Sequence, residues 1–191
     1  MSASWDEEVI YKWGSTMGKE FYDKGAQVQL GPGLNVARVP RCGRNFEYLS
    51  GEDPYLGYTL AKQAVWGIQN QSVMANAKHF VNNNQETHRT SVSENVDERT
   101  RFEMYYPPFE GAIEAGVGSV MCSYNKLNDT YSCENNSTLN TDLRDRLGFK
   151  GYVMSDWGAT HSVSIASGLD QEQGAIEADD GPGLVFTQEE V

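Results

Sequence analysis

The chain has 191 residues, of which 39% are hydrophobic, and its formal net charge is −12. This length allows one domain with a sizeable core, and the composition is not typical of a disordered segment. The acidic balance disfavours phosphate backbones and anionic lipid head groups as partners, so we expect neutral or cationic ligands, no nucleic acid and no membrane.

The first predicted element is an N-terminal helix. Ser4 and Glu7 form a capping box, and the helical pattern runs to Gly25. Its apolar positions are Val9, Trp13, Met17 and Phe21. The opening segment MSASWDEEVI lacks a basic end followed by an apolar core, so we do not expect it to be a secretory leader.

Four short apolar segments are typical of strands that are buried on both faces of a parallel sheet. They are AQVQL ending at Leu30, SVMANAK ending at Lys78, GSVMCS ending at Ser123 and GYVMS ending at Ser155. A fifth strand is expected near SIASGLD, residues 164–170.

Helical patterns separate these strands. Asp53 and Pro54 indicate a helix start, followed by the apolar stripe Leu56, Leu60, Ala61, Ala64, Val65 and Ile68. A second helical face starts at Asp97 and includes Phe102, Tyr105, Tyr106, Phe109 and Ile113, with Pro107 and Pro108 expected to split or kink it. A third stripe, Leu139, Leu143 and Leu147, ends at Gly148.

The alternation of helices and strands predicts right-handed βαβ units and a parallel α/β fold. No G-x-G-x-x-G follows the first strand, which favours a (β/α) barrel over a dinucleotide-binding fold. A whole barrel needs about 250 residues and eight strands. We therefore predict a partial (β/α)8, TIM-like barrel over 1–170 and an acidic tail of unassigned structure over 171–191. Its open strand edges predict poor solubility or dependence on a partner.

Polar residues follow three of the predicted strands, where barrel enzymes carry their active sites. They are Lys78 and His79, Tyr124 and Asn125, and Asp156 and Trp157. Each has an ordinary structural alternative: a solvated pair for Lys78 and His79, a core rim position for Tyr124, and a helix N-cap for Asp156. Their shared placement favours a functional site.

Metal and acyl-transfer chemistry find no support in the sequence. His79, His88 and His161 share no ligand spacing, so no metal site is expected. A G-x-S-x-G elbow and a Cys-His signature are also missing. Carboxylate chemistry on a neutral substrate, without a cofactor, remains.

The cysteines and asparagines leave alternatives open. Cys122 and Cys133 flank a polar stretch and would suit a disulfide in a secreted protein, but three unrelated thiols fit the spacing equally well. If Cys122 and Cys133 are bonded, Cys42 is free or paired with residues outside this chain. Candidate glycosylation sequons lie at Asn70, Asn128, Asn135 and Asn136.

Several ordered motifs resemble the β-glucosidase branch of glycoside hydrolase family 3 between Ser4 and Asp170. They are GRNFEYLSGEDPYLG, AKHFVNNNQETHR, VMCSYNKLND and LGFKGYVMSDWGATHS. The resemblance implies that Asp156 is the catalytic nucleophile of a retaining β-glucosidase that acts on terminal β-linked glucose in polysaccharide and cellulose degradation. It also implies substrate-binding roles for Arg44, Lys78, His79, Met121, Tyr124 and Trp157.

These residue types suit that chemistry. A retaining glycosidase needs an ionised carboxylate about 5 to 5.5 Å from a protonated one. Lys78 and Arg44 are expected to keep Asp156 ionised. Tyr124 would orient the carboxylate, and Trp157 would offer an apolar face to the sugar.

The chain also departs from the family pattern. The acid/base glutamate of the family comes from a following α/β sandwich domain, and an upstream segment carries another sugar-binding aspartate; neither has a counterpart here. Glu172 and Glu177 are not credible replacements, so we expect this chain to be an inactive fragment of an extracellular parent enzyme. The alternatives are an inactive carbohydrate-binding remnant, a β-xylosidase of the same family, and an incomplete product with no stable fold.

The loop after the Lys-His pair separates subgroups of the family. N-acetylglucosaminidases resemble K-H-F-P-G-H-G there and supply a local histidine as acid/base, whereas this chain reads KHFVNNNQETHR. His88 is therefore expected to be an ordinary loop histidine.

Overall fold

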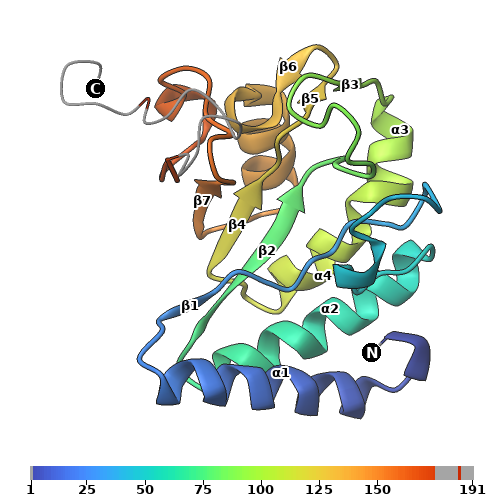
Figure 1. Ribbon diagram of the computed structural model, residues 1–191, viewed down its shortest axis with the longest axis vertical. Helices are drawn as coiled ribbons and strands as arrows, with labels where there is room; N and C mark the ends of the chain where they lie inside the picture. The colour runs from blue at the N-terminus through green and yellow to red at the C-terminus, as the bar shows by residue number, and fades with distance from the viewer. Residues whose placement is uncertain (1, 175–184, 186–191) are drawn as a thin grey trace.

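The computed structural model describes residues 2–174 and residue 185. Its centre is a sheet of parallel strands in the order β1-β2-β4-β7 (Figure 1). Their bounds are Val28–Gln29 for β1, Met74–Phe80 for β2, Ser119–Cys122 for β4 and Tyr152–Ser155 for β7. All four predicted strands are therefore present, and β2 continues beyond the predicted end at Lys78.

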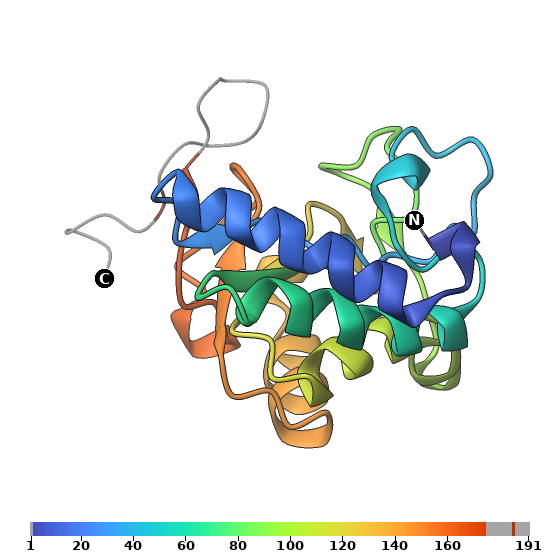
Figure 2. The same ribbon diagram turned by 90° about the horizontal axis from the view of Figure 1, so that it is seen from below.

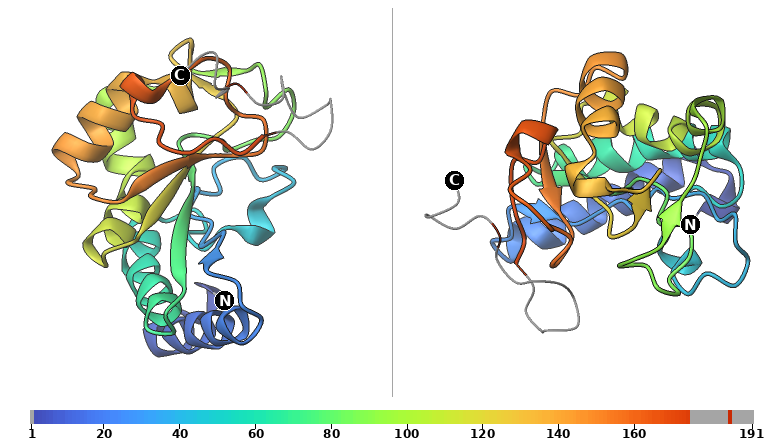
Figure 3. Two further views of the ribbon diagram at one scale, coloured as in Figure 1. Left: turned by 90° about the vertical axis from the view of Figure 1, so that its left-hand side faces the viewer. Right: turned by 90° about the horizontal axis from the view of Figure 1, so that it is seen from above.

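The helices α1, α2 and α4 lie on one side of this sheet (Figure 3). The α-helices are α1 Glu7–Asp23, α2 Pro54–Gln69, α3 Glu98–Thr100 and α4 Pro107–Glu114, and π-helical segments span η3 Arg101–Tyr105 and η5 Ser137–Arg146. Short 3-10 turns occupy η1 Ser2–Ser4, η2 Asn45–Glu47, η4 Ser132–Glu134 and η6 Ile165–Ser167. None of the helices in the described part of the chain is long and apolar enough to cross a bilayer.

The fold is thus α/β, a parallel segment of a TIM-type barrel. Its sheet has four strands, half of the eight in a closed barrel. Residues 171–173 run beside β7, where Gln171 forms a parallel bridge with Met154 and Gln173 N–H donates to Ser155 Oγ. The rest of the predicted acidic tail lies outside the described residues, apart from residues 174 and 185.

The start of α1 differs from the predicted capping box. Asp6 is the N-cap, and its Oδ1 accepts hydrogen bonds from the backbone N–H groups of Glu8 and Val9. Ser4 belongs to the preceding 3-10 turn. The prediction of a capping box at Ser4 was therefore wrong, because the Asp6 carboxylate lies closer to the first turn and accepts from its free N–H groups.

The buried face of α1 also differs from the predicted stripe, whose four residues are only half-buried. Ile10, Gly14 and Gly18 are the buried positions. Figure 2 shows α1 alongside α2, and a Cβ on Gly14 would lie 2.7 Å from the Ala64 carbonyl oxygen. The two backbones approach so closely that glycines, rather than the larger apolar side chains, form the contact.

Asp53 caps α2 as predicted, with Oδ1 accepting from Tyr55 N–H. Pro107 begins α4 and so divides the predicted long helix into two parts. Residues 165–167 form a 3-10 turn, so the fifth strand expected there was wrong.

A second, small sheet was not predicted. It consists of β3 Ser93–Glu94, β5 Lys126–Leu127 and β6 Thr130–Tyr131, in the order β3-β5-β6. Strands of two residues carry no periodic pattern that sequence reasoning could detect.

A disulfide joins Cys122, the last residue of β4, to Cys133 in the turn η4. Both residues are almost fully buried, and they are 11 positions apart in the sequence. Cys42 is buried and free. The bond fixes the chain that leaves β4 against the edge of the site described below.

Replacing both Cys122 and Cys133 with serine is expected to lower the free energy of unfolding by about 3 kcal/mol, the scale for a short closed loop. Urea titration of the oxidised wild type and of the double variant would measure the difference. Cys42→Ser is the matched control, since it removes a buried thiol but no cross-link. Equal loss in both proteins would show that the disulfide adds nothing.

The sequons differ in accessibility. Asn70 and Asn136 are exposed, whereas Asn135 is buried and its amide nitrogen donates to the Leu127 carbonyl oxygen. Asn128 is exposed, but both of its amide atoms hydrogen bond to the backbone of Val96. Asn70 Nδ2 donates to Tyr11 Oη and Asn136 Oδ1 accepts from Asn140, so each of these exposed side chains has one bonded amide atom and is more available as an acceptor than Asn128 or Asn135.

Candidate active site

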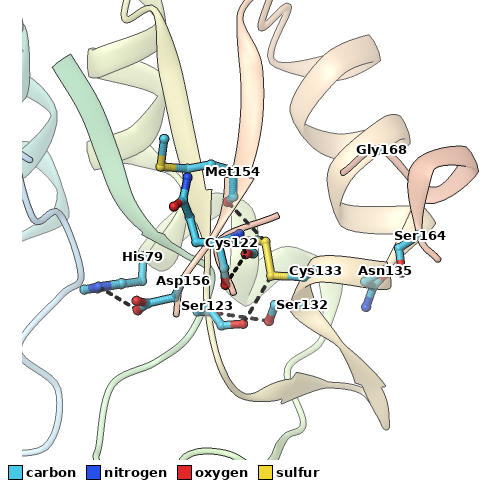
Figure 4. The surroundings of a disulfide bond; sticks show 12 residues. His79, Cys122, Ser123, Ser132, Cys133, Asn135, Met154, Asp156, Ser164 and Gly168 are labelled. Atoms are coloured by element: carbon cyan, nitrogen blue, oxygen red, sulfur yellow. Dashed lines mark hydrogen bonds and ion pairs between the residues drawn. A yellow bond between two sulfur atoms is a disulfide. The ribbon is translucent and has the colours of Figure 1, made fainter. Parts of the chain in front are cut away.

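The carboxyl ends of β2, β4 and β7 bring most of the predicted residues together. Asp156 directly follows β7, and its backbone N–H donates to the Cys122 carbonyl oxygen at the end of β4. Figure 4 shows the Asp156 carboxylate facing the His79 ring, with the Cys122–Cys133 disulfide close by.

The sequence pattern predicted that Lys78 and His79 follow the second strand, but both residues lie within β2. The register of β2 against β4 shifts between Lys78 and Phe80. At this irregularity the side chain of Asn35 hydrogen bonds to both backbone groups of His79. Its Oδ1 accepts from His79 N–H at 2.7 Å, and its Nδ2 donates to His79 O at 3.2 Å. Asn35 is buried and was missed by sequence reasoning, although it belongs to the glycine turn GPGLN.

Glu47 holds the two cationic side chains of the site. Arg44 donates from Nε to Oε2 at 2.7 Å and from Nη2 to Oε1 at 2.6 Å, and Lys78 Nζ lies 3.0 Å from Oε1. Burial alone would raise the pKa of Glu47, but hydrogen bonds and positive charge from Arg44 and Lys78 bring it below the ordinary value. Glu47 is therefore an ionised clamp; its spacing of three residues from Arg44 was the only sequence signal.

His79 is almost completely buried and has a partner at each ring nitrogen. Tyr48 Oη lies 3.1 Å from Nδ1, and Arg44 Nη2 lies 3.1 Å from Nε2. Burial, reinforced by the positive charges of Arg44, Lys78 and Arg89, lowers the pKa of His79 well below its usual value. The ring is thus neutral at physiological pH.

The two oxygens of Asp156 have different surroundings. Oδ1 accepts from the Trp157 backbone N–H at 2.8 Å. Oδ2 lies 3.2 Å from His79 Nε2 but accepts no hydrogen bond from the described residues. The neutral ring forms no ion pair with Oδ2, which is therefore a buried oxygen without a hydrogen-bond partner among the described residues.

Burial raises the pKa of Asp156 above its ordinary value. Hydrogen bonds from Trp157 and Tyr124 and the charges of Arg44 and Lys78 act in the opposite direction without cancelling this effect. Arg44 and Lys78 thus favour the ionised form of Asp156, in the direction predicted, but burial at seven per cent exposure has the larger effect on the pKa.

Asp156 also borders a cavity of about 280 Å³. Met121 and the half-exposed Trp157 line this cavity together with Leu30 and Met154. The cations Arg44 and Lys78 and their clamp Glu47 are not among its lining residues. The predicted substrate-binding residues therefore fall into two groups, with Asp156 between them.

Arg89 is a further polar residue of the site that sequence reasoning missed. Its guanidinium carbon lies 4.2 Å from the centre of the Tyr124 ring, and Nη1 lies 3.1 Å from Glu86 Oε2. The loop that supplies both charges follows β2. His88, in the same loop, is exposed. Within the described ranges, no cluster of histidine, cysteine or acidic side chains could hold a metal ion.

Comparison with known proteins places this geometry in context. Residues 1–180 match the family described as "Glycosyl hydrolase family 3 N terminal domain". "Probable beta-glucosidase L" of Aspergillus terreus is 43% identical over 190 residues, which cover 98% of this chain and 26% of the relative. "Beta-glucosidase 1" of Aspergillus aculeatus is 46% identical over 186 residues, 89% of this chain and 22% of the relative.

Solved structures of β-glucosidases are also similar to this chain. The β-glucosidase DesR from Streptomyces venezuelae, in complex with D-glucose, superposes with a TM-score of 0.91 at 40% identity over 98% of this chain and 25% of that chain. The β-D-glucoside glucohydrolase of Trichoderma reesei has a TM-score of 0.88 at 43% identity over 96% of this chain and 26% of that chain. The chain thus spans about a quarter of the length of these proteins.

Proposed function

Because the chain belongs to glycosyl hydrolase family 3, we propose that it supplies the nucleophile and the sugar-binding side chains of a retaining β-glucosidase. The substrate is a terminal, non-reducing β-D-glucosyl residue, and the intermediate is a covalent glycosyl-enzyme on Asp156. The observation that carries this proposal is the Asp156 carboxylate, which has one oxygen held by Trp157 N–H and the other uncommitted.

The surroundings of Asp156 support a neutral, hydroxyl-rich substrate. Arg44 and Lys78 present N–H donors that Glu47 fixes in place. Trp157 is 40% exposed and offers an aromatic face. Sugars bind to such a combination of charged hydrogen-bonding groups and an apolar platform.

The general acid is not among the carboxylates described around Asp156. Glu47 is ion-paired with two cations and has a lowered pKa, which suits an acceptor and not a proton donor. Glu86 is paired with Arg89. We therefore propose that this chain is part of a longer protein, whose further α/β sandwich domain contributes the acid. The buried disulfide and the exposed sequons at Asn70 and Asn136 support an extracellular location for that parent.

The test uses the complete parent protein. Incubation with a fluorinated aryl β-glucoside, followed by peptide mass spectrometry, should find the sugar attached to Asp156 and release of the aryl group in equal amount. Labelling of another side chain would refute the nucleophile assignment.

The absence of an acid from the described site favours a second candidate, a sugar-binding remnant. Calorimetric titration with glucose and an assay with an aryl glucoside that needs little acid assistance separate the two functions. Binding of glucose by the complete parent without release of phenol would favour the remnant.

Glu47→Gln is expected to lower kcat/KM of the complete protein by about 10- to 100-fold, because charge-assisted hydrogen bonds of this kind contribute about 1.5 to 3 kcal/mol. The glutamine is neutral and has one acceptor oxygen, so it cannot hold Arg44 in a fork and Lys78 at once. Initial rates with an aryl glucoside measure the effect.

Glu114→Gln is the control for this variant, since it removes the carboxylate from an exposed pair with Lys62. It should change kcat/KM by less than about twofold. Equal rates for Glu47→Gln and the wild type would mean that Arg44 and Lys78 need no clamp.

A further inference from the structure

The proton of the neutral His79 ring has two places it can occupy. A neutral imidazole carries one N–H donor and one lone-pair acceptor, and the partners decide which nitrogen is which. Here the partners are Tyr48 at Nδ1, and Arg44 and Asp156 at Nε2.

Arg44 determines whether Nε2 carries a proton. A guanidinium has only N–H donors and stays protonated, so Nη2 at 3.1 Å requires a lone pair on Nε2. The other hydrogen of Nη2 is used by Glu47 Oε1 at 2.6 Å, which fixes the orientation of the group. The absence of a hydrogen bond to Asp156 Oδ2 from the described residues agrees with an Nε2 that has no proton to give.

The proton must then lie on Nδ1, where the Tyr48 hydroxyl is its acceptor. Tyr48 is buried, and its ring meets the His79 ring edge-on at a centroid distance of 5.9 Å. No other hydrogen bond of the Tyr48 hydroxyl appears among the described residues. Its oxygen is therefore free to accept the Nδ1 proton.

We propose that Tyr48 is a positioning residue that keeps the His79 proton on Nδ1, so that Nε2 acts only as an acceptor and donates nothing to Asp156. The catalytic consequence rests on the proposed glucosidase function. A proton donated from Nε2 would stabilise the Asp156 carboxylate and weaken it as a nucleophile. With the proton on Nδ1, Oδ2 keeps its lone pairs and is the attacking oxygen, while Nε2 can accept a hydrogen bond only from a sugar hydroxyl or from Arg44.

The position of the proton can be measured without any sugar, so this test is independent of the proposed function. Nitrogen-15 NMR of histidine-labelled chain distinguishes protonated from unprotonated ring nitrogens. The chain has only three histidines, and His88→Gln and His161→Gln assign the remaining signals to His79. We expect a protonated Nδ1 and a bare Nε2 at neutral pH. A protonated Nε2, or protons on both nitrogens, would overturn the proposal.

Tyr48→Phe tests the role of Tyr48 in the complete protein. Loss of the acceptor leaves a buried Nδ1–H unsatisfied, so the Nδ1 form loses its advantage. Part of the population should then carry the proton on Nε2, where it gives up the hydrogen bond from Arg44 and can be donated to Asp156. We expect kcat/KM to fall by about 10- to 100-fold, the range seen when outer hydrogen-bond partners are removed. The acidic limb of the pH profile, which reports the free nucleophile, should shift to lower pH.

The other groups that face this pair remain in place in the variant. They are Arg44, Lys78, Arg89 and Tyr124. Tyr58→Phe is the matched control, because it removes a hydroxyl that contacts Lys62 and Glu114; its pH profile should equal that of the wild type. A fall in kcat/KM for Tyr48→Phe with an unmoved acidic limb would indicate a merely structural role and refute the proposal.

Discussion

Asp156→Asn should abolish glucoside hydrolysis by the complete protein and stabilise the fold at neutral pH. The amide cannot form the glycosyl-enzyme, so the expected loss is about 10⁴- to 10⁶-fold in kcat, the range found when a nucleophile is removed. The fold should gain roughly 1 kcal/mol, because an ionised carboxylate with incomplete compensation is replaced by a neutral side chain. Single-turnover kinetics and urea unfolding measure the two effects.

The gain in stability should depend on pH in a defined direction. The pKa of Asp156 is raised in the folded protein. Below about pH 4, the usual carboxyl pKa, the group is neutral in both folded and unfolded chains and costs nothing. As the pH rises through the folded pKa, the buried group must ionise, so the wild type loses stability relative to Asp156→Asn. An equal gain at pH 4 and pH 7 would contradict this account.

The position of the proposed nucleophile, Asp156, was predictable because it depends on a local pattern. Three apolar residues before a polar residue mark the end of a buried strand, and parallel strands bring such ends to one edge. Asp156 and Tyr124 follow that rule. Lys78 and His79 do not, since β2 continues to Phe80 and the Asn35 side chain hydrogen bonds to the backbone of His79.

The residues that set the electrostatics of the site could not be found in this way. Glu47 and Tyr48 come from a short turn whose contacts with Lys78 and His79 span about thirty positions of sequence. No periodicity encodes such a contact. The raised pKa of Asp156 could not be predicted for a related reason: the nearby cations are visible in the sequence motifs, but the depth of burial is a property of the assembled sheet.

A second buried carboxylate, Asp142, provides the opposite case. It lies in η5 and is 1% exposed. Tyr106 donates to Oδ2 at 2.7 Å, Arg101 Nη2 lies 3.3 Å from Oδ2, and Arg146 Nη1 lies 3.3 Å from Oδ1. These contacts tie η5 to the segment formed by η3 and the residue that follows it. Unlike Asp156, the carboxylate has partners at both oxygens.

Asp142→Asn should therefore destabilise the fold by about 3 kcal/mol, since it leaves the guanidinium of Arg101 buried without its counter-ion. Urea unfolding at neutral pH measures the loss. The double variant Asp142→Asn with Arg101→Met should recover part of it, because no unpaired charge remains. The same Asp-to-Asn change is thus expected to weaken the chain at position 142 and strengthen it at 156. If the free energy of unfolding changed in the same direction in Asp142→Asn and Asp156→Asn, the hydrogen-bonding partners of the two carboxylates would not explain their difference in stability.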